Sequence, residues 1–368
     1  MSTLDNWYKH FLKSFTVATR NCILKCIKSI NDNRGKQMQQ DIITMVHGSG
    51  GSATSELINE IFASEFRNDT LDQMEDSAVV PGGGRIAITT DSFVVTPPEF
   101  KGGDIGRLCI CGTVNDLLMR GAVPKYITCG FILEEGVKID LLKRVVHSMA
   151  ETAREAGVQI VAGDTKVVNG NGEFYINTAG VGIVSDGVDI KASNACDGDV
   201  IIVSGTMGDH HAAILSERME IDTSVTSDNA PLVEMVQNLL AQNIKVHTLR
   251  DITRGGLGTV MKELAEASGK TFYVMDEAIP VKQVVRDFCG LLGLDPVYMG
   301  NEGKLIAIVD REDADRALEI IRNSKYGEDA AIIGEVKEDA PGQVILKTKI
   351  GGKRSLDILQ GEGLPRIC

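Results

Sequence analysis

The sequence predicts a mixed α/β protein with two domains, and three observations support this. The chain of 368 residues is long enough for two ordinary hydrophobic cores. Segments with strand-like and helix-like hydrophobic periodicity alternate along most of it. A polar, glycine-containing segment over 186–199 separates two such series. We therefore expect domains over 45–190 and 191–350, preceded by an extension over 1–44 and followed by a mobile tail over 351–368.

Glycine turns and apolar periodicity define the elements expected in the first domain. A glycine loop over 47–51 precedes an amphipathic segment that predicts a helix. Strands are expected over 85–95, 126–133, 159–168 and 174–184. Helices are expected over 105–120 and 140–156, the second ended by Gly157.

The same patterns predict a second α/β series after residue 199. Its expected strands cover 200–204, 271–275, 304–309 and 331–336. Its expected helices cover 231–240, 257–267, 282–292 and 313–323.

The first 44 residues differ from the rest of the chain. They carry seven Lys or Arg against three acidic residues. Trp7, Phe11 and Phe15 recur at near-helical spacing, which allows an amphipathic helix. A basic, acid-poor segment is compatible with organelle targeting. We favour a dispensable extension, either disordered or helical.

Charge and cysteine usage exclude several classes of function. The net charge of -13 argues against binding to nucleic acid or an anionic membrane. The eight cysteines form no CxxC pair, and no secretory signal is visible, so we expect a reducing cytoplasm. No apolar run is long enough to span a bilayer.

Acidic residues in turns and at expected strand ends indicate a magnesium–polyphosphate site. Mg²⁺ prefers carboxylate oxygens and shares its shell with phosphates and water. The glycine loop before a helix would offer backbone N–H groups to phosphate. There is no GxxxxGK[ST] motif and no strict GxGxxG motif. The candidate metal ligands are Asp76, Asp91, Asp116, Asp209 and Asp251.

The last residue, Cys368, follows a glycine-rich segment that predicts a mobile arm. A thiol on such an arm is well placed to carry a covalently bound group between sites. A frayed end with an incidental thiol is the alternative, and the tail alone does not decide between them.

Eight short motifs carry a specific resemblance. They are His47–Gly51, Thr90–Ser92, Gly112–Asp116, Cys129–Gly136, Gly163–Val168, Arg250–Gly256, Asn301–Leu305 and Pro365–Cys368. With them, the sequence resembles the HypE family of hydrogenase-maturation carbamoyl dehydratases from about residue 46 to the end. This family belongs to the superfamily of aminoimidazole ribonucleotide (AIR) synthetase, selenophosphate synthetase and thiamine-monophosphate kinase. The chain departs from the family pattern in residues 1–44 and at His211, where glycine is usual and a side chain could crowd Asp209.

The resemblance implies a two-domain PurM-like fold. Its N-terminal half would form a dimer-interface β-barrel flanked by helices, and its C-terminal half an α/β sandwich. The implied activity is ATP-dependent dehydration of a carbamoyl group on Cys368 to a thiocyanate, the source of the cyanide ligands of NiFe-hydrogenase iron. The implied cofactors are ATP and Mg²⁺. The implied partners are a second copy of the chain, the carbamoyltransferase HypF and a HypC–HypD complex that accepts cyanide.

The resemblance also implies roles for individual residues. Cys368 would carry the group, Glu302 would accept a proton, and Lys166 would stabilise developing negative charge. The implied ATP- and phosphate-binding residues are Gly48, Ser49, Gly50, Gly51, Asp91, Asn115, Asp116, Gly163, Asp164 and Thr165.

Two alternatives remain at this point. A selenophosphate synthetase typically carries a reactive cysteine beside its N-terminal glycine loop, whereas the nearest upstream cysteine here is Cys26. A non-catalytic carrier would shuttle a group on Cys368 but would need no Mg²⁺ site.

Overall fold

The computed structural model describes residues 51–57, 59, 73, 75, 78–81, 84–134 and 136–360. The chain divides into two units, Met1–Met45 and Val46–Cys368, and every described residue belongs to the second. The extension, the loop residues 47–50, Asp76 and the tail from residue 361 lie outside the described residues.

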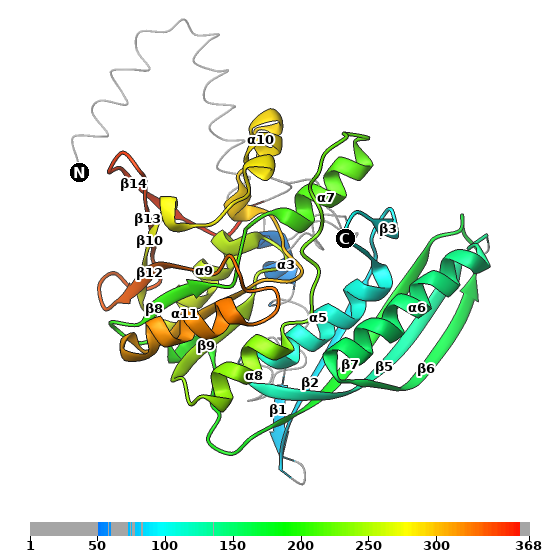
Figure 1. The fold of residues 1–368 in the computed structure, drawn as a ribbon, viewed down its shortest axis with the longest axis horizontal. Coiled ribbons are helices and arrows are strands. Elements are labelled where there is room, and N and C mark those ends of the chain that lie inside the picture. The colour runs from blue at the N-terminus through cyan, green and yellow to red at the C-terminus, as the bar shows by residue number, and fades with distance from the viewer. Residues whose placement is uncertain are drawn as a thin grey trace, which may run out of the picture. The chain divides into compact units, whose positions relative to one another are not determined.

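A five-stranded sheet in the order β1-β2-β7-β5-β6 forms the first half of the described chain. All its neighbours are antiparallel except β5 and β6, which are parallel. Helices α5 and α6 lie along this sheet (Figure 1). The elements of this half are α3 (Ser52–Leu57), β1 (Ala78–Pro81), β2 (Arg85–Phe93), β3 (Glu99–Phe100), β4 (Gly103–Asp104), α5 (Ile105–Met119), β5 (Ala122–Glu134), α6 (Ile139–Ala156), β6 (Gln159–Val168) and β7 (Phe174–Val184).

Helix α5 is buried almost all round and packs against the strands of this sheet. The residue before the helix, Asp104, is its N-cap. The Asp104 carboxylate accepts the N–H groups of Gly106 and Arg107 at 2.7 and 3.0 Å. Such a cap satisfies two of the N–H groups that a helix start leaves without partners. The cap fixes where α5 starts, and the helix carries one of the candidate site residues.

A seven-stranded sheet in the order β14-β13-β10-β12-β8-β11-β9 forms the second half. Its central strands β8 and β11 are buried along their whole length, which explains their continuous Val, Ile and Leu sequences. The strands are β8 (Val200–Val203), β9 (Val246–Asp251), β10 (Thr271–Met275), β11 (Leu305–Val309), β12 (Ala331–Lys337), β13 (Val344–Lys347) and β14 (Lys353–Leu356). The α-helices are α7 (Asp209–Arg218), α8 (Val233–Ala241), α9 (Gly256–Ser268), α10 (Gln283–Leu292) and α11 (Ala314–Asn323).

The structure confirms the mixed α/β fold class. Strands β6, β7 and β10 have the expected bounds, and the other expected elements after residue 84 are displaced by a few residues at most at each end, except β5, which begins earlier. Seven of the described α-helices and strands were not expected: β1, β3, β4, α7, β9, β13 and β14. No helix among the residues that the structure describes is long and apolar enough to cross a bilayer.

Candidate active site

A cavity of about 250 Å³ lies where residues of the two sheets meet. Residues of β2 and α5 line it from the first half, and the last residue of β9, the residues just after it and a residue before β11 line it from the second. Four carboxylates contribute to its wall: Asp91, Asp116, Asp251 and Glu302. The structure thus brings together four acidic residues from four separate sequence motifs.

The first half supplies Asp91 on β2 and Asp116 on α5. The Asp116 Oδ2 atom accepts the Thr89 hydroxyl at 2.7 Å, which fixes this carboxylate against β2. Gly112 lies one turn before Asp116 on α5. A Cβ atom there would lie 2.9 Å from the ring of Phe93, so glycine lets the helix approach the strand closely. This close approach places both carboxylates in one cavity.

The second half supplies Asp251, the last residue of β9, which is almost fully buried. The chain then turns into α9 through Gly255 and Gly256, whose φ angles of 80° and 64° favour glycine. Arg254, just before this turn, is exposed and lines the same cavity. The cavity wall therefore combines carboxylates with one guanidinium group.

Glu302 lies among other negative charges. Burial raises the pKa of Glu302 well above its usual range, and the charges of Asp251, Asp91 and Asp228 raise it further. Arg254 opposes this rise. A carboxylate with a raised pKa is a better proton acceptor than an exposed one. Glu302 therefore has the environment that a general base needs.

The donor set fits a hard divalent cation. Burial also raises the pKa of Asp91, against the opposing effects of Arg254 and the Ser92 N–H group. Several carboxylates that repel one another in a buried cavity become more stable when a cation lies between them. Oxygen ligands of this kind suit Mg²⁺. Asp91, Asp116 and Asp251 are the described residues best placed to hold such an ion.

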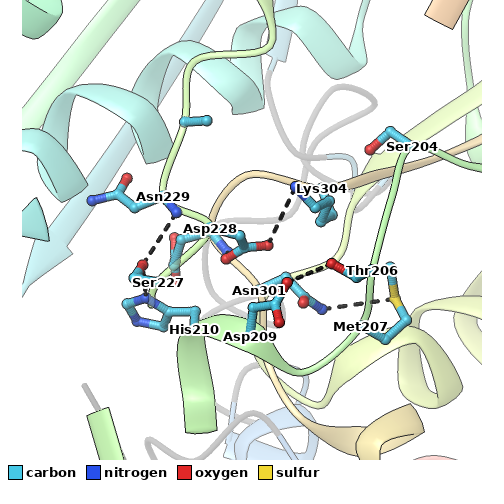
Figure 2. Close-up of polar contacts among 12 residues, drawn as sticks. Ser204, Thr206, Met207, Asp209, His210, Ser227, Asp228, Asn229, Asn301 and Lys304 are labelled. Carbon is cyan, nitrogen blue, oxygen red and sulfur yellow. Dashed lines mark hydrogen bonds and ion pairs between the residues drawn. The ribbon is translucent and has the colours of Figure 1, made fainter. Parts of the chain in front are cut away.

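Asp228 was not expected at the site. Its Oδ1 atom accepts the backbone N–H of Glu302 at 3.0 Å, and its Oδ2 atom lies 4.0 Å from the Lys304 ammonium. Figure 2 shows Lys304 reaching toward this carboxylate. The Asp228 side chain is only 2% exposed. It therefore holds the Glu302 backbone and places a negative charge close to it. The only sequence signal was a polar Ser-Asp-Asn triplet before an apolar segment.

The loop over 227–232 joins the two halves of the site. The Asn115 amide donates to the Ala230 carbonyl at 3.0 Å and accepts the Leu232 N–H at 2.9 Å. Arg107 Nε donates to the Asn229 carbonyl at 2.9 Å. Asn115 is 2% exposed. Its contacts show a structural role between α5 and this loop and give no support to the phosphate-binding role expected for it.

Asp209 lies outside this cavity, at the start of α7. Its buried carboxylate accepts the Thr206 hydroxyl and pairs with Lys282 at 3.0 Å. Both contacts involve the Oδ2 atom, whereas the buried Oδ1 atom has no hydrogen-bond partner among the described residues. His211 does not crowd it, because the His211 side chain turns to the Gly300 N–H, at 3.4 Å.

Lys166 lies on β6, an edge strand, and is exposed. Asp91 on β2 pairs with Thr178 on β7, Thr178 pairs with Cys129 on β5, and Cys129 pairs with Gly163 on β6. Asp91 and Gly163 therefore lie at the same level of the sheet. Three strand spacings separate β2 from β6, or about 14 Å. Lys166 and the Gly163-Asp164-Thr165 segment therefore do not meet Asp91 within one chain.

The glycine loop is described only at its last residue. Gly51 is buried, and its carbonyl accepts the Ser55 N–H at 3.1 Å at the start of α3. Gly48, Ser49, Gly50, Asp76 and Cys368 lie outside the described residues, so their roles remain predictions.

Comparison with known proteins decides the family. The N-terminal domain model of AIR synthase related proteins matches residues 74–184, and the C-terminal domain model matches residues 197–347. The carbamoyl dehydratase HypE of Cupriavidus necator is 49% identical over 332 residues, which cover 89% of this chain and 95% of that protein. The Escherichia coli HypE is 46% identical over 337 residues, covering 89% and 99%.

The chain belongs to the HypE family. A crystal structure of the hydrogenase maturation protein HypE in complex with ATP aligns with a TM-score of 0.75 at 45% identity, covering 89% of this chain and all of that one. A HypE–HypF complex aligns with a TM-score of 0.78 at 44% identity, covering 82% and 99%. The thiamine monophosphate kinase of Aquifex aeolicus, at 19% identity, shares the fold, with a TM-score of 0.63 over 81% of this chain and 97% of that one. The resemblance seen in the sequence motifs is confirmed.

Proposed function

We propose that this member of the HypE family is an ATP-dependent carbamoyl dehydratase of hydrogenase maturation, acting on a carbamoyl group carried by Cys368. The observation that carries this proposal is the cavity in which Asp91, Asp116, Asp251 and Glu302 converge. Such a site suits a phosphoryl-transfer enzyme and is superfluous in a simple thiol carrier. Relatives at 46–49% identity are named carbamoyl dehydratase HypE, and one solved HypE holds ATP.

The reaction needs a leaving group, because an amide oxygen does not leave as hydroxide. The oxygen of the S-carbamoyl group attacks the γ-phosphorus of ATP, ADP leaves, and the nitrogen loses one proton to give a phosphorylated imidate. The C–O bond then breaks, phosphate leaves with that oxygen, and the nitrogen loses its second proton. The product is a thiocyanate on Cys368, together with ADP and phosphate.

Different residues of the cavity support different steps of this reaction. Glu302 accepts protons from nitrogen, and Asp228 positions Glu302 through its backbone N–H. Arg254 faces charge on the transferring phosphoryl group. Mg²⁺, held by Asp91, Asp116 and Asp251, would neutralise phosphate charge. Phosphate binding by the glycine loop over 48–51, and metal binding by Asp76 and Asp209, remain part of the proposal.

A homodimer would complete the site. The face of the first sheet that α5 and α6 leave uncovered carries partly exposed apolar residues: Ile88, Tyr126, Ile132 and Ile183. Their exposed fractions of 40–48% are unusual for such side chains, and contiguous apolar surface marks interfaces. A second copy packed there could bring its β6, with Lys166, Asp164 and Thr165, to the Asp91 side of the first.

The proposal extends to the partners of the protein, its location and the limits of its domains. We infer that HypF delivers the carbamoyl group and that a HypC–HypD complex accepts the cyanide. The described cysteines are free, which favours a reducing cytoplasm. We place the domains at 45–190 and 191–350, with the carrier tail after them.

The decisive experiment is an intact-mass spectrum of the full chain after incubation with ATP, carbamoyl phosphate and the carbamoyl-transferring partner. We expect the carbamoylated C-terminal peptide to lose the mass of one water only when ATP is present. A carbamoyl group that remains intact, with no ATP consumed, would support the carrier alternative and contradict the dehydratase.

Replacing either cavity acid of the first domain should weaken nucleotide binding. Asp91→Asn and Asp116→Asn should each reduce MgATP affinity by at least about 10-fold, because each loses a metal-binding charge. Isothermal calorimetry measures this, and Asp222→Asn is the control because Asp222 is fully exposed. Wild-type affinity in both cavity variants would remove these residues from the site.

The charge of Asp228 should be visible in the pH profile. Glu302 must be deprotonated to accept a proton, so turnover rises as pH increases through its pKa. Asp228 raises that pKa. Asp228→Asn removes the charge, while the new amide oxygen can still accept the Glu302 N–H. The pKa of Glu302 should therefore fall, and the acidic limb of the pH–rate profile should move to lower pH. Asp222→Asn should leave the limb in place. A slower Asp228→Asn enzyme with an unmoved limb would mean that Asp228 is only structural.

A further inference from the structure

A thiol, a carboxylate and an imidazole that the proposed reaction does not use meet at the edge of the second sheet. Cys196 and Asp199 lie in the turn before β8, and His247 lies on the edge strand β9. One potential ligand atom of each lies within 4.8 Å of the other two. Cys196 is exposed, unlike the other cysteines in the described part of the chain, which are Cys109, Cys111, Cys129 and Cys289.

The backbone holds these three side chains in place. The Asp199 Oδ2 atom accepts the Cys196 N–H at 2.7 Å and bonds His247 Nδ1 at 2.7 Å. Gly198 adopts a φ of 91° and donates its N–H to the Val336 carbonyl at 2.9 Å. The turn is therefore fixed to a neighbouring strand, and ligand binding would cost little backbone conformational entropy.

The charges around Asp199 are compatible with a bound cation. Asp199 is 3% exposed, and its ion-pair partner is His247. Lys245, two residues before His247, pairs with Asp310 at 2.7 Å. A metal ion would balance the buried carboxylate without displacing that lysine.

We propose that Cys196, Asp199 and His247 form a binding site for Zn²⁺, with a water molecule as the fourth ligand. Thiolate and imidazole ligands select Zn²⁺ over the Mg²⁺ that the oxygen-only cavity suits. Ligand atoms around a tetrahedral zinc lie about 3.3–3.7 Å apart, as metal–ligand distances of about 2.0–2.3 Å require. On metal binding, the 2.7 Å separation of Asp199 Oδ2 and His247 Nδ1 would lengthen and the wider separations, of up to 4.8 Å, would shorten through side-chain rotation. The Cys196 thiol is held only by the Asn194 carbonyl, at 3.2 Å, and a thiol is a weak donor.

The zinc site is separate from the proposed reaction. His247 lies four residues before Asp251 on β9, or about 13 Å along the strand. Metal binding there should therefore leave MgATP binding and dehydration unchanged. This separation allows the zinc site to be tested whether or not the proposed function is correct.

Titration of the full-length protein with Co²⁺, a spectroscopic substitute for Zn²⁺, tests the proposal. We expect one equivalent to produce a thiolate-to-cobalt charge-transfer band, which Zn²⁺ then abolishes. Cys196→Ser should remove the band, and His247→Gln should weaken binding by at least about 10-fold. A variant with Ser in place of Cys22, Cys26 and Cys368 should keep the band, because these thiols are not part of the site.

Absence of a band in the wild-type protein would overturn the proposal, and so would a full band in Cys196→Ser or an unchanged affinity in His247→Gln. Cys196 is exposed, so its replacement should not affect folding, and an unchanged MgATP affinity in the Ser variant checks this. Because Asp199 is buried, its replacement could disturb the turn, and the test therefore rests on Cys196 and His247.

Discussion

A Cys368→Ala variant should bind MgATP with the affinity of the wild-type protein and produce no thiocyanate. The variant lacks the sulfur that we propose carries the carbamoyl group, whereas the acidic cavity proposed to bind the nucleotide is unchanged. Cysteine sulfur is an intrinsically strong nucleophile, which suits it to accept the carbamoyl group. Mass spectrometry of the C-terminal peptide measures the product, and calorimetry measures MgATP affinity.

The matched control for this result is Cys196→Ser, because the Cys196 thiol is exposed and lies elsewhere in the chain. It should be carbamoylated and dehydrated like the wild-type protein. If the Cys368→Ala variant still acquired and dehydrated a carbamoyl group at another residue, the proposed role of the tail would be wrong.

A Glu302→Gln variant should accept the carbamoyl group and bind MgATP but dehydrate about 10²–10⁴-fold more slowly, the usual contribution of a general base. Glutamine has nearly the same shape, and the backbone N–H that Asp228 accepts is retained. Single-turnover conversion of carbamoylated protein, followed by mass, measures the rate of the chemical steps directly.

Glu302→Asp tests whether a carboxylate at this position supports the reaction when its distance from the substrate changes. It retains a carboxylate but shortens the side chain by one methylene, so it should recover part of the lost rate. Near-normal dehydration by Glu302→Gln would instead assign Glu302 a structural role. MgATP affinity should be close to that of the wild-type protein in both variants, because Asp91, Asp116 and Asp251 remain.

Local patterns were sufficient for much of the fold. Strands β6, β7 and β10 are apolar segments bounded by turn residues, and their limits could be predicted from these signals. Helix α7 was missed because residues on all its sides are buried, so its sequence shows no amphipathic period. Strand β9 was missed because its residues Val246–Asp251 mix apolar and polar side chains without regular alternation.

The candidate site was predicted in part. Asp91, Asp116, Asp251 and Glu302 were identified from their motifs, and the structure places them around one cavity. Asp228 was not identified, because its importance depends on a hydrogen bond to residue 302, which is 74 positions away. Such long-range pairing follows from the packing of the two sheets and has no local sequence signature.

The loop over 227–232 also bears on how far the two halves of the molecule can separate. Four hydrogen bonds connect this loop to the first half of the chain. Two involve Asn115 and one involves Arg107, both on α5. The fourth runs from the Ser227 N–H to the Lys101 carbonyl. At about 0.5–1.5 kcal/mol each, breaking all four costs roughly 2–6 kcal/mol. Other contacts also join the halves, such as the hydrogen bond from Arg107 to the Tyr326 hydroxyl at 3.1 Å, so an opened conformer would make up at most a few per cent of the ensemble. Catalytic turnover would therefore proceed while the two halves of the described chain stay in contact.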